Sequence, residues 1–196
     1  MKDVFLNIDL FKIINEYTDL RSLCDTCSLL SITLKKYINY KLNKKYSLMY
    51  YDDVLFRNIV LSKIFNPYKQ LHLNLRECKK IKDVSALRNV HTLDLSYCKN
   101  ITDVSALGQV HTLNLRECNK ITDVSALGHV HTLDLGYCYG ITNVSALGHV
   151  HTLDLMKCYK ITDVSALGNC HTLNLRLCEH ITDVSALGNV HNLILP

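Results

Sequence analysis

The sequence predicts an α/β fold, in which a small all-α N-terminal domain precedes a solenoid of short repeats. The solenoid is expected to have a parallel β-sheet on its concave side and turns or short 3₁₀ helices on its convex side. One observation is a 20-residue unit that recurs six times between residues 71 and 190, followed by the fragment HNLILP at 191–196; such a period is typical of solenoids. The other is that residues 1–66 contain no glycine and carry apolar residues at helical spacing. We therefore expect a helical domain at 1–66 and a repeat domain at 67–196.

The N-terminal part shows two apolar stripes at helical spacing, formed by Leu10, Ile13, Ile14 and Tyr17 and by Leu20, Leu23, Cys24, Cys27 and Leu30. A third helix is expected from Asp52, as its N-cap, to Phe65, because the residue before Pro67 is disfavoured in a helix. Cys24 and Cys27 form a lone CxxC motif. No second pair completes a zinc site, so packing in the core is favoured over redox chemistry.

Within one repeat, for example 111–130, the apolar residues have a fixed order. Leu113 and Leu115 are two apart and therefore share one face of a short strand. The remaining apolar residues are spaced by three, at Val110, Cys118, Ile121, Val124, Leu127 and Val130. This pattern predicts one strand per turn of the coil, with its leucines pointing inward.

The return arm DVSALG is too short for a long helix and predicts a tight turn or a 3₁₀ helix. Asp123 or Ser125 is expected to cap it through a side-chain oxygen. Gly128 stands where the chain reverses toward the next strand, and we expect it to supply a permissive backbone there.

Cysteine and histidine each recur once per repeat. The cysteines are Cys78, Cys98, Cys118, Cys138, Cys158 and Cys178, and the histidines are His91, His111, His131, His151, His171 and His191. Metal binding, redox sensing or a pH response are the functional interpretations. The structural interpretations are favoured: a small buried thiol that donates weakly to the backbone, and a residue that makes a backbone hydrogen bond at the turn into each strand. A ladder spreads its ligands along an axis, whereas a zinc site needs them to converge. We therefore expect no metal and no cofactor.

The positions that differ between near-identical repeats are candidates for recognition. The Thr and Asp/Asn columns of the strands barely vary, whereas the second and third positions after the Asp/Asn column do. We expect a protein-binding surface at Arg76, Tyr97, Arg116, Tyr137, Met156 and Arg176, since Tyr and Arg are frequent in interface hot spots. Neutral variation of exposed positions is the alternative.

Charge and composition exclude several classes of function. The chain has 22 Lys and Arg against 18 Asp and Glu, and the repeats from residue 71 onward are neutral, with 11 of each sign. No basic stripe suggests nucleic-acid binding, and no apolar run is long enough to span a membrane. No nucleophile or phosphate-binding loop accompanies the His and Asp columns. We therefore expect a protein that is not an enzyme and that binds neither nucleic acid nor membrane.

The repeat resembles a known signature. The pattern V-x-x-L-x-L-x-x-C-x-x-I, as at residues 110–121, is similar to the leucine-rich repeat, with Cys where many repeats have Asn. The arm I-T-D-V-S-A-L is similar to the short repeats of internalins. The resemblance covers residues 71–195 and implies a solenoid that binds a protein target on its concave face.

The segment LNIDLFKIINEYTDLRSLCDTCSLLSITLKKY resembles an F-box, although it has Asn7 where the family has Pro and lacks the family's Trp. The resemblance implies that a Skp-type adaptor of a cullin-type ubiquitin ligase binds Leu6, Ile8, Leu10, Ile13, Ile14, Leu20 and Leu23. An F-box followed by leucine-rich repeats would then be a substrate receptor. The joining segment DDVLFRNIVLSKIFNPYKQLHLNL is similar to F-box proteins of giant DNA viruses. The alternative is a non-enzymatic binding scaffold whose N-terminal helices only cap the solenoid.

Two further expectations concern the ends of the sequence. Asp3, Asp9 and Lys12 interrupt the N-terminal apolar stretch, which argues against a signal peptide and for a cytoplasmic protein, in a host cell if the viral resemblance holds. Ile194 replaces the usual Asp or Asn of its column in the last strand. An open strand edge with apolar neighbours invites pairing, so we expect a homodimer formed end to end through residues 191–196.

Overall fold

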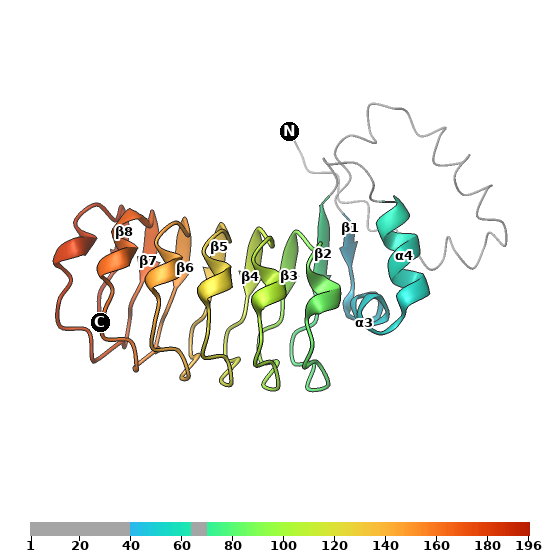
Figure 1. The fold of residues 1–196 in the computed structure, drawn as a ribbon, viewed down its shortest axis with the longest axis horizontal. Helices are drawn as coiled ribbons and strands as arrows, with labels where there is room; N and C mark the ends of the chain where they lie inside the picture. The colour runs from blue at the N-terminus through green and yellow to red at the C-terminus, as the bar shows by residue number, and fades with distance from the viewer. Residues whose placement is uncertain (1–39, 64–69) are drawn as a thin grey trace, which may run out of the picture.

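The computed structural model describes residues 40–63 and 70–196. The repeats coil into a solenoid that carries one strand and one 3₁₀ helix per unit (Figure 1). Eight strands form a single sheet in chain order, and every neighbouring pair is parallel. The solenoid expected from the 20-residue period is therefore confirmed.

The strands are β1 (Tyr40–Leu42), β2 (Leu71–Asn74), β3 (Thr92–Asp94), β4 (Thr112–Asn114), β5 (Thr132–Asp134), β6 (Thr152–Asp154), β7 (Thr172–Asn174) and β8 (Asn192–Ile194). The 3₁₀ helices are η2 (Ser85–Leu87), η3 (Ser105–Leu107), η4 (Ser125–Leu127), η5 (Ser145–Leu147), η6 (Ser165–Asn169) and η7 (Ser185–Leu187). Two α-helices, α3 (Lys44–Asp52) and α4 (Val54–Lys63), lie beside β1 at one end of the solenoid (Figure 1). Neither is long and apolar enough to cross a membrane, within the residues described.

The register of the sheet follows the sequence period. Leu93 pairs with Leu113, and Leu113 with Leu133, so that equivalent side chains form columns along the solenoid. Leu113 and Leu115 are at most 1% exposed, which confirms that they point inward. Because side chains alternate along a strand, the Thr and Asp/Asn columns and the second position after the Asp or Asn lie on the opposite surface, which we call the sheet face.

The return arms are 3₁₀ helices, and an acidic or amide side chain holds the start of each one. Asp123 Oδ1 accepts a hydrogen bond of 2.9 Å from the N–H of Ser125. The same contact recurs in every repeat, with Asn143 in place of Asp. Of the two expected caps, Asp123 is therefore the one that accepts.

The expected role of Gly128 is wrong. Its φ of −61° is an ordinary helical value, so no permissive backbone is needed. A Cβ at this position would instead lie 2.4 Å from the carbonyl oxygen of Ala146 in the next repeat. Glycine lets successive return arms approach each other closely, whereas the first repeat has Arg88 at the equivalent position.

The N-terminal part differs from the expectation in two ways. The last helix, α4, begins one residue later than predicted: Asp53, not Asp52, accepts the N–H groups of Leu55 and Phe56, at 2.8 and 3.1 Å. A strand, β1, also lies in a region expected to be entirely helical, and it extends the sheet by pairing with β2. The two apolar stripes of the earlier helices lie outside the described residues.

Helix α3 closes the first turn of the solenoid through the buried Ser47 and an exposed ion pair. Ser47 is fully buried; its hydroxyl donates to the carbonyl oxygen of Leu42 at 3.2 Å and accepts from the N–H of Asn74 at 3.0 Å. Asp52, at the end of α3, forms an ion pair with Lys80 of the first repeat. These contacts cover the end of the core that the first repeat would otherwise expose.

Candidate protein-binding surface

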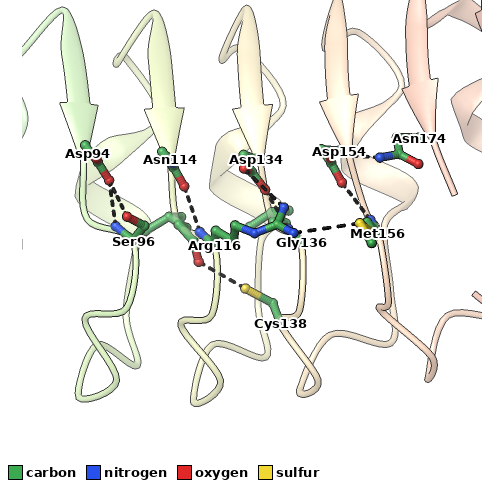
Figure 2. Close-up of polar contacts among 12 residues, drawn as sticks. Asp94, Ser96, Asn114, Arg116, Asp134, Gly136, Cys138, Asp154, Met156 and Asn174 are labelled. Atoms are coloured by element: carbon green, nitrogen blue, oxygen red, sulfur yellow. Dashed lines mark hydrogen bonds and ion pairs between the residues drawn. The ribbon is translucent and has the colours of Figure 1, made fainter. Parts of the chain in front are cut away.

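A turn at the end of each strand places the variable residues. The Asp or Asn that ends a strand accepts a hydrogen bond from the N–H two residues later, as Asn114 Oδ1 does from Arg116 at 3.0 Å and Asp134 Oδ1 from Gly136 at 2.8 Å (Figure 2). The contact is present in all six repeats. This Asx-type turn explains why the Asp/Asn column barely varies: it fixes the backbone on which the variable column stands.

The next residue in each repeat has a left-handed backbone. The positive φ values lie between 60° and 64°, at Glu77, Tyr97, Glu117, Tyr137, Lys157 and Leu177. The N–H of each of the first five donates to a carbonyl of the following repeat, as that of Tyr137 does to Met156 at 2.8 Å. The left-handed conformation is therefore part of the ladder between repeats.

Arginine and tyrosine residues from neighbouring repeats pack together on this surface. The guanidinium of Arg76 lies 4.7 Å from the ring centroid of Tyr97, and that of Arg116 lies 4.5 Å from the ring centroid of Tyr137. Lys157 approaches the same Tyr137 ring, at 5.2 Å. Cation–π contacts of this geometry are attractive, so they stabilise this arrangement of the side chains.

Arg116 reaches across a whole repeat. Its side chain passes over Gly136, and its Nη2 lies 3.7 Å from Met156 Sδ (Figure 2). A Cβ at Gly136 would lie 2.7 Å from Arg116 Nη1, so the glycine makes room for the guanidinium. Nη1 also lies 3.7 Å from Asp134 Oδ2. The structure thus brings together three of the six predicted residues: Arg116, Tyr137 and Met156.

The other predicted residues lie apart from this group. Arg76 and Tyr97 form their own pair, in which Arg76 Nε also donates to Glu77 at 3.1 Å. Arg176 is exposed, and within the described residues its side chain has no ring or ion-pair partner. The predicted surface is therefore two local clusters and one isolated arginine on a common face.

Two tyrosines outside the predicted set also pack against this group. Tyr139 packs edge-on against Tyr137, with centroids 6.3 Å apart, and stacks on Tyr159 at 5.1 Å. Both stand at a position that varies between repeats, and they are 20 residues apart. This spacing is the sequence signal that places one tyrosine above the other. We call Arg116, Tyr137, Tyr139, Met156, Lys157 and Tyr159 the central cluster.

The cysteines fill the turn behind this surface. Cys138 is fully buried, and its Sγ lies 3.2 Å from the carbonyl oxygen of Leu115 in the preceding repeat (Figure 2). The same contact joins Cys98, Cys118, Cys158 and Cys178 to the preceding repeat, at 3.1 to 3.3 Å. Burial raises the pKa of Cys118 to about 12, which keeps the thiol protonated as a weak donor. The column matches the structural interpretation.

The histidines form a stack of parallel rings along the solenoid. Adjacent centroids from His91 to His171 are 4.6 Å apart. Each Nδ1 lies 3.2 or 3.3 Å from the hydroxyl of the following Thr. Within the described residues, no group of His, Cys, Asp or Glu converges on a metal position. Each His directly precedes its strand, as expected, but among the described residues its ring contacts the side-chain hydroxyl of Thr and does not make the backbone hydrogen bond predicted for a turn residue of this kind.

Comparisons with known proteins match part of the chain. Residues 86–107 match the Leucine Rich repeat family, and no curated protein matches the chain. Among solved structures, internalin C2 of Listeria monocytogenes is 26% identical over 65% of this chain and 61% of that one, with a TM-score of 0.46.

Two further Listeria monocytogenes structures are similar. Internalin InlF is 21% identical over 65% of this chain and 47% of that one, with a TM-score of 0.42. The functional domain of InlJ, which includes a cysteine ladder, is 24% identical over 61% of this chain and 32% of that one, with a TM-score of 0.38. The chain thus spans less than two thirds of the length of each of these structures. With one inward-facing leucine strand per 20-residue unit and a parallel register throughout, the repeats form a leucine-rich-repeat solenoid.

Proposed function

We propose that this protein is a binding scaffold that holds a protein partner on its sheet face, at the central cluster. The main support is that side chains at variable positions of an otherwise repetitive solenoid pack against one another as one cluster of an Arg, a Lys, a Met and three Tyr. Arg and Tyr are enriched in interface hot spots. Contacts that already hold these side chains together lower the entropic cost of binding.

Site-specific cross-linking tests this proposal. The variant Tyr139→p-benzoylphenylalanine places a photoreactive group in the central cluster, and Thr102→p-benzoylphenylalanine places the same group on an exposed return arm as a matched control. In cells that express the protein, the first variant is expected to capture a discrete partner that the second does not. Addition of Arg116→Glu should abolish the capture. Equal capture by both variants, insensitive to Arg116, would contradict the proposal.

A finer proposal is that the chain is an F-box-like substrate receptor, with the solenoid presenting a target to a cullin-type ubiquitin ligase. It rests on the resemblance of the N-terminal segment. The adaptor-binding residues proposed there, Leu6 to Leu23, lie outside the described residues. A cytoplasmic location belongs with this proposal and stays a prediction.

The alternative is that the N-terminal segment only caps the solenoid, and the contacts of α3 support a capping role for residues 44–52. Ser47 and Asp52 join α3 to β2 and the first repeat, so at least this part of the segment covers the core. A pull-down with a purified Skp-type adaptor separates the two. Capture that is lost in Leu10→Glu/Ile13→Glu but kept in Arg116→Glu supports the receptor. No capture at micromolar concentration by the folded wild-type chain supports the cap alone.

Self-association through the last strand is also a prediction. Ile194 and Leu195 are about half exposed, and β8 pairs only with β7 among the described strands. Sedimentation at high concentration tests it: Ile194→Asp should shift a dimer to a monomer, whereas a wild-type chain that is strictly monomeric would remove the idea.

A further inference from the structure

The histidine column forms one continuous stack of imidazole rings across the interfaces between repeats. Ring centroids from His91 to His171 are 4.6 Å apart, with interplanar angles of 9° to 18°, and His191 lies 4.9 Å from His171. His72 lies beside the first of these rings, with its centroid 5.9 Å from that of His91. We call the six residues His91, His111, His131, His151, His171 and His191 the histidine stack.

Protonation of the histidine stack places like charges close together. Histidine is the side chain whose charge ordinarily changes between about pH 8 and pH 5. Two neighbouring rings 4.6 Å apart repel each other when both are charged. In the unfolded chain the same histidines are 20 residues apart in sequence. This separation corresponds to roughly 25 Å, which exceeds the screening length of ~8 Å at physiological salt. The repulsion therefore belongs to the folded state.

No carboxylate among the described residues offsets this charge in an ion pair. None of the ion pairs in this part of the chain includes a histidine. The acidic column of the strands begins three residues beyond each histidine, and Asp94, Asp134 and Asp154 each use Oδ1 to accept a backbone N–H. Charged rings of the stack would thus face one another without a bound counter-charge.

The other ionisable groups near the stack are themselves basic. Lys41 of β1 pairs in register with His72, and burial, followed by the charge of Lys41, lowers the pKa of His72. Burial, followed by the neighbouring His111 and His72, lowers the pKa of His91. His129 and His149 stand two residues before members of the stack, and the equivalent positions of the other repeats hold Asn or Gln. The surroundings therefore add to the repulsion.

The residues of the stack also carry backbone hydrogen bonds between repeats. The N–H of His111 donates to the carbonyl oxygen of His91 at 3.0 Å, and the same bond continues from repeat to repeat as far as His171, at 3.0 to 3.1 Å. The Thr hydroxyl beside each Nδ1 can accept as well as donate, so this contact does not prevent protonation. Repulsion between the rings consequently acts directly on the interfaces between repeats.

We propose that the histidine stack is a pH-sensitive element that weakens the interfaces between repeats as the pH falls from about 7 to about 5. The folded protein resists protonation of the stack more than the unfolded chain does. The free energy of unfolding is therefore highest above about pH 7 and falls on acidification. The loss is graded, because each added charge makes protonation of the next ring harder. This inference does not depend on the proposed function.

Urea unfolding of the full chain at about pH 7.5 and pH 5 tests the inference within the range in which histidine titrates. The variant His111→Gln/His151→Gln removes every second ring from the middle of the stack and leaves His91, His131 and His171 about 9 Å apart. The matched control, His129→Gln/His149→Gln, removes the same number of histidines from exposed positions outside the stack.

We expect the urea midpoint of the wild type to fall on acidification at least twice as far as that of the stack variant, and as far as that of the control variant. A second measurement needs only the wild type, in case the stack variant does not fold. At 1 M NaCl the screening length of ~3 Å is shorter than the distance between rings, so added salt should recover more stability at pH 5 than at pH 7.5. Equal shifts in the two double variants, a wild-type midpoint that does not change with pH, or a loss that salt leaves unchanged would each overturn the inference.

Discussion

Single residues in this solenoid carry backbone strain where variation is greatest. A left-handed conformation costs a residue with a Cβ about 1–2 kcal/mol, yet none of the six residues that adopt it is glycine. Five of these residues, Tyr137 among them, donate their N–H to the next repeat. Leu177 has no such bond among the described residues and adopts the same conformation. This conformation turns the side chain away from the strand and toward its neighbours on the surface. The backbone of the repeat thus fixes the position of this side chain on the surface, while the type of residue can differ from repeat to repeat.

The cysteine column is expected to be inert toward thiol reagents in the folded protein. Burial raises the pKa of Cys98 and Cys170 to about 11 and of Cys118 and Cys158 to about 12, and the thiolate is the reactive form. In a variant with Cys24 and Cys27 replaced by Ser, at most Cys78, the least buried of the column, should react with DTNB at pH 8. Rapid modification of several thiols before unfolding in urea would refute the burial.

The same thiols predict a loss of stability at alkaline pH. Burial raises the pKa of Cys118 and Cys158 from 9.0 in the unfolded chain to about 12 in the folded protein. Below pH 9 both states keep the thiol proton. As the pH rises from 9 toward 12 the unfolded state loses this proton first, so the free energy of unfolding falls. At pH 10 each of these two thiols should reduce the free energy of unfolding by about 1.4 kcal/mol. Because Tyr and Lys also titrate there, the measurement compares urea unfolding at pH 8 and pH 10 in wild type and in Cys118→Ala/Cys158→Ala. The variant should lose about 3 kcal/mol less; an identical loss would show that the thiols titrate normally.

Two glycines in equivalent positions should respond oppositely to substitution. In Gly128→Ala the new Cβ meets the carbonyl oxygen of Ala146 at 2.4 Å, whereas at Gly188 nothing lies within 4 Å. Forcing the repeats apart should cost about 1–3 kcal/mol. Gly188→Ala keeps a helical φ of −61° and should be neutral or stabilising by up to ~1 kcal/mol. Thermal unfolding of both variants checks the pair, and equal destabilisation would remove the close-approach explanation.

At the scale of elements, the sequence predicts what the repeats share and misses what occurs once. Every inward Leu, Ile, Val and Cys column could be predicted because each repeat meets the same neighbours. The strand β1, with the sequence YKL, has only three residues and a central Lys, so no periodicity marks it. The adjacent Asp52 and Asp53 are chemically identical, and only the backbone path decides which one caps α4.

The sequence predicts which positions form the candidate surface, but it does not predict which of their side chains contact one another. Variation between repeats singles out Arg116 and Tyr137 individually. Their packing depends on the reach of the arginine over Gly136, which needs the register and the left-handed turn in three dimensions. Tyr139 and Tyr159 show the converse case, because their 20-residue spacing alone predicts that they stack.

The junction of α3 with the first repeat should depend on Ser47. Ser47→Ala removes the donor to the buried carbonyl of Leu42 and the acceptor for the part-buried N–H of Asn74, and a buried polar group left unpaired costs about 1–3 kcal/mol. Ser105→Ala, on an exposed return arm, should change stability by less than ~0.5 kcal/mol. Chemical denaturation compares the two. Equal effects would mean that α3 contributes little to the end of the core.

On the scale of the whole molecule, the solenoid is a series of nearly equivalent interfaces. The register, the Cys–carbonyl contact and the His stack recur from one repeat to the next. Stability of such an array is close to a sum of repeats and nearest-neighbour interfaces. No long-range contact along the solenoid axis is needed to close the fold.

Deletion of one complete unit should therefore leave a folded protein. Without residues 131–150, Val130 joins His151 and every remaining repeat meets a neighbour of its own kind. We expect the circular dichroism per residue to be unchanged and the urea m-value to fall by roughly a sixth. A deletion of ten residues, which breaks the register, is the control and should not fold. Loss of cooperative unfolding in the 20-residue deletion would show that the repeats are not equivalent.

The glycine at the end of most return arms packs closely against the alanine carbonyl oxygen of the next arm. This repeated contact has an evolutionary consequence. Because this contact is the same between nearly all neighbouring repeats, unequal crossing-over between the gene segments that encode them yields longer or shorter chains. In these chains the new neighbouring repeats also fit each other. Such exchange reshuffles which cationic and aromatic side chains become adjacent without disturbing the frame.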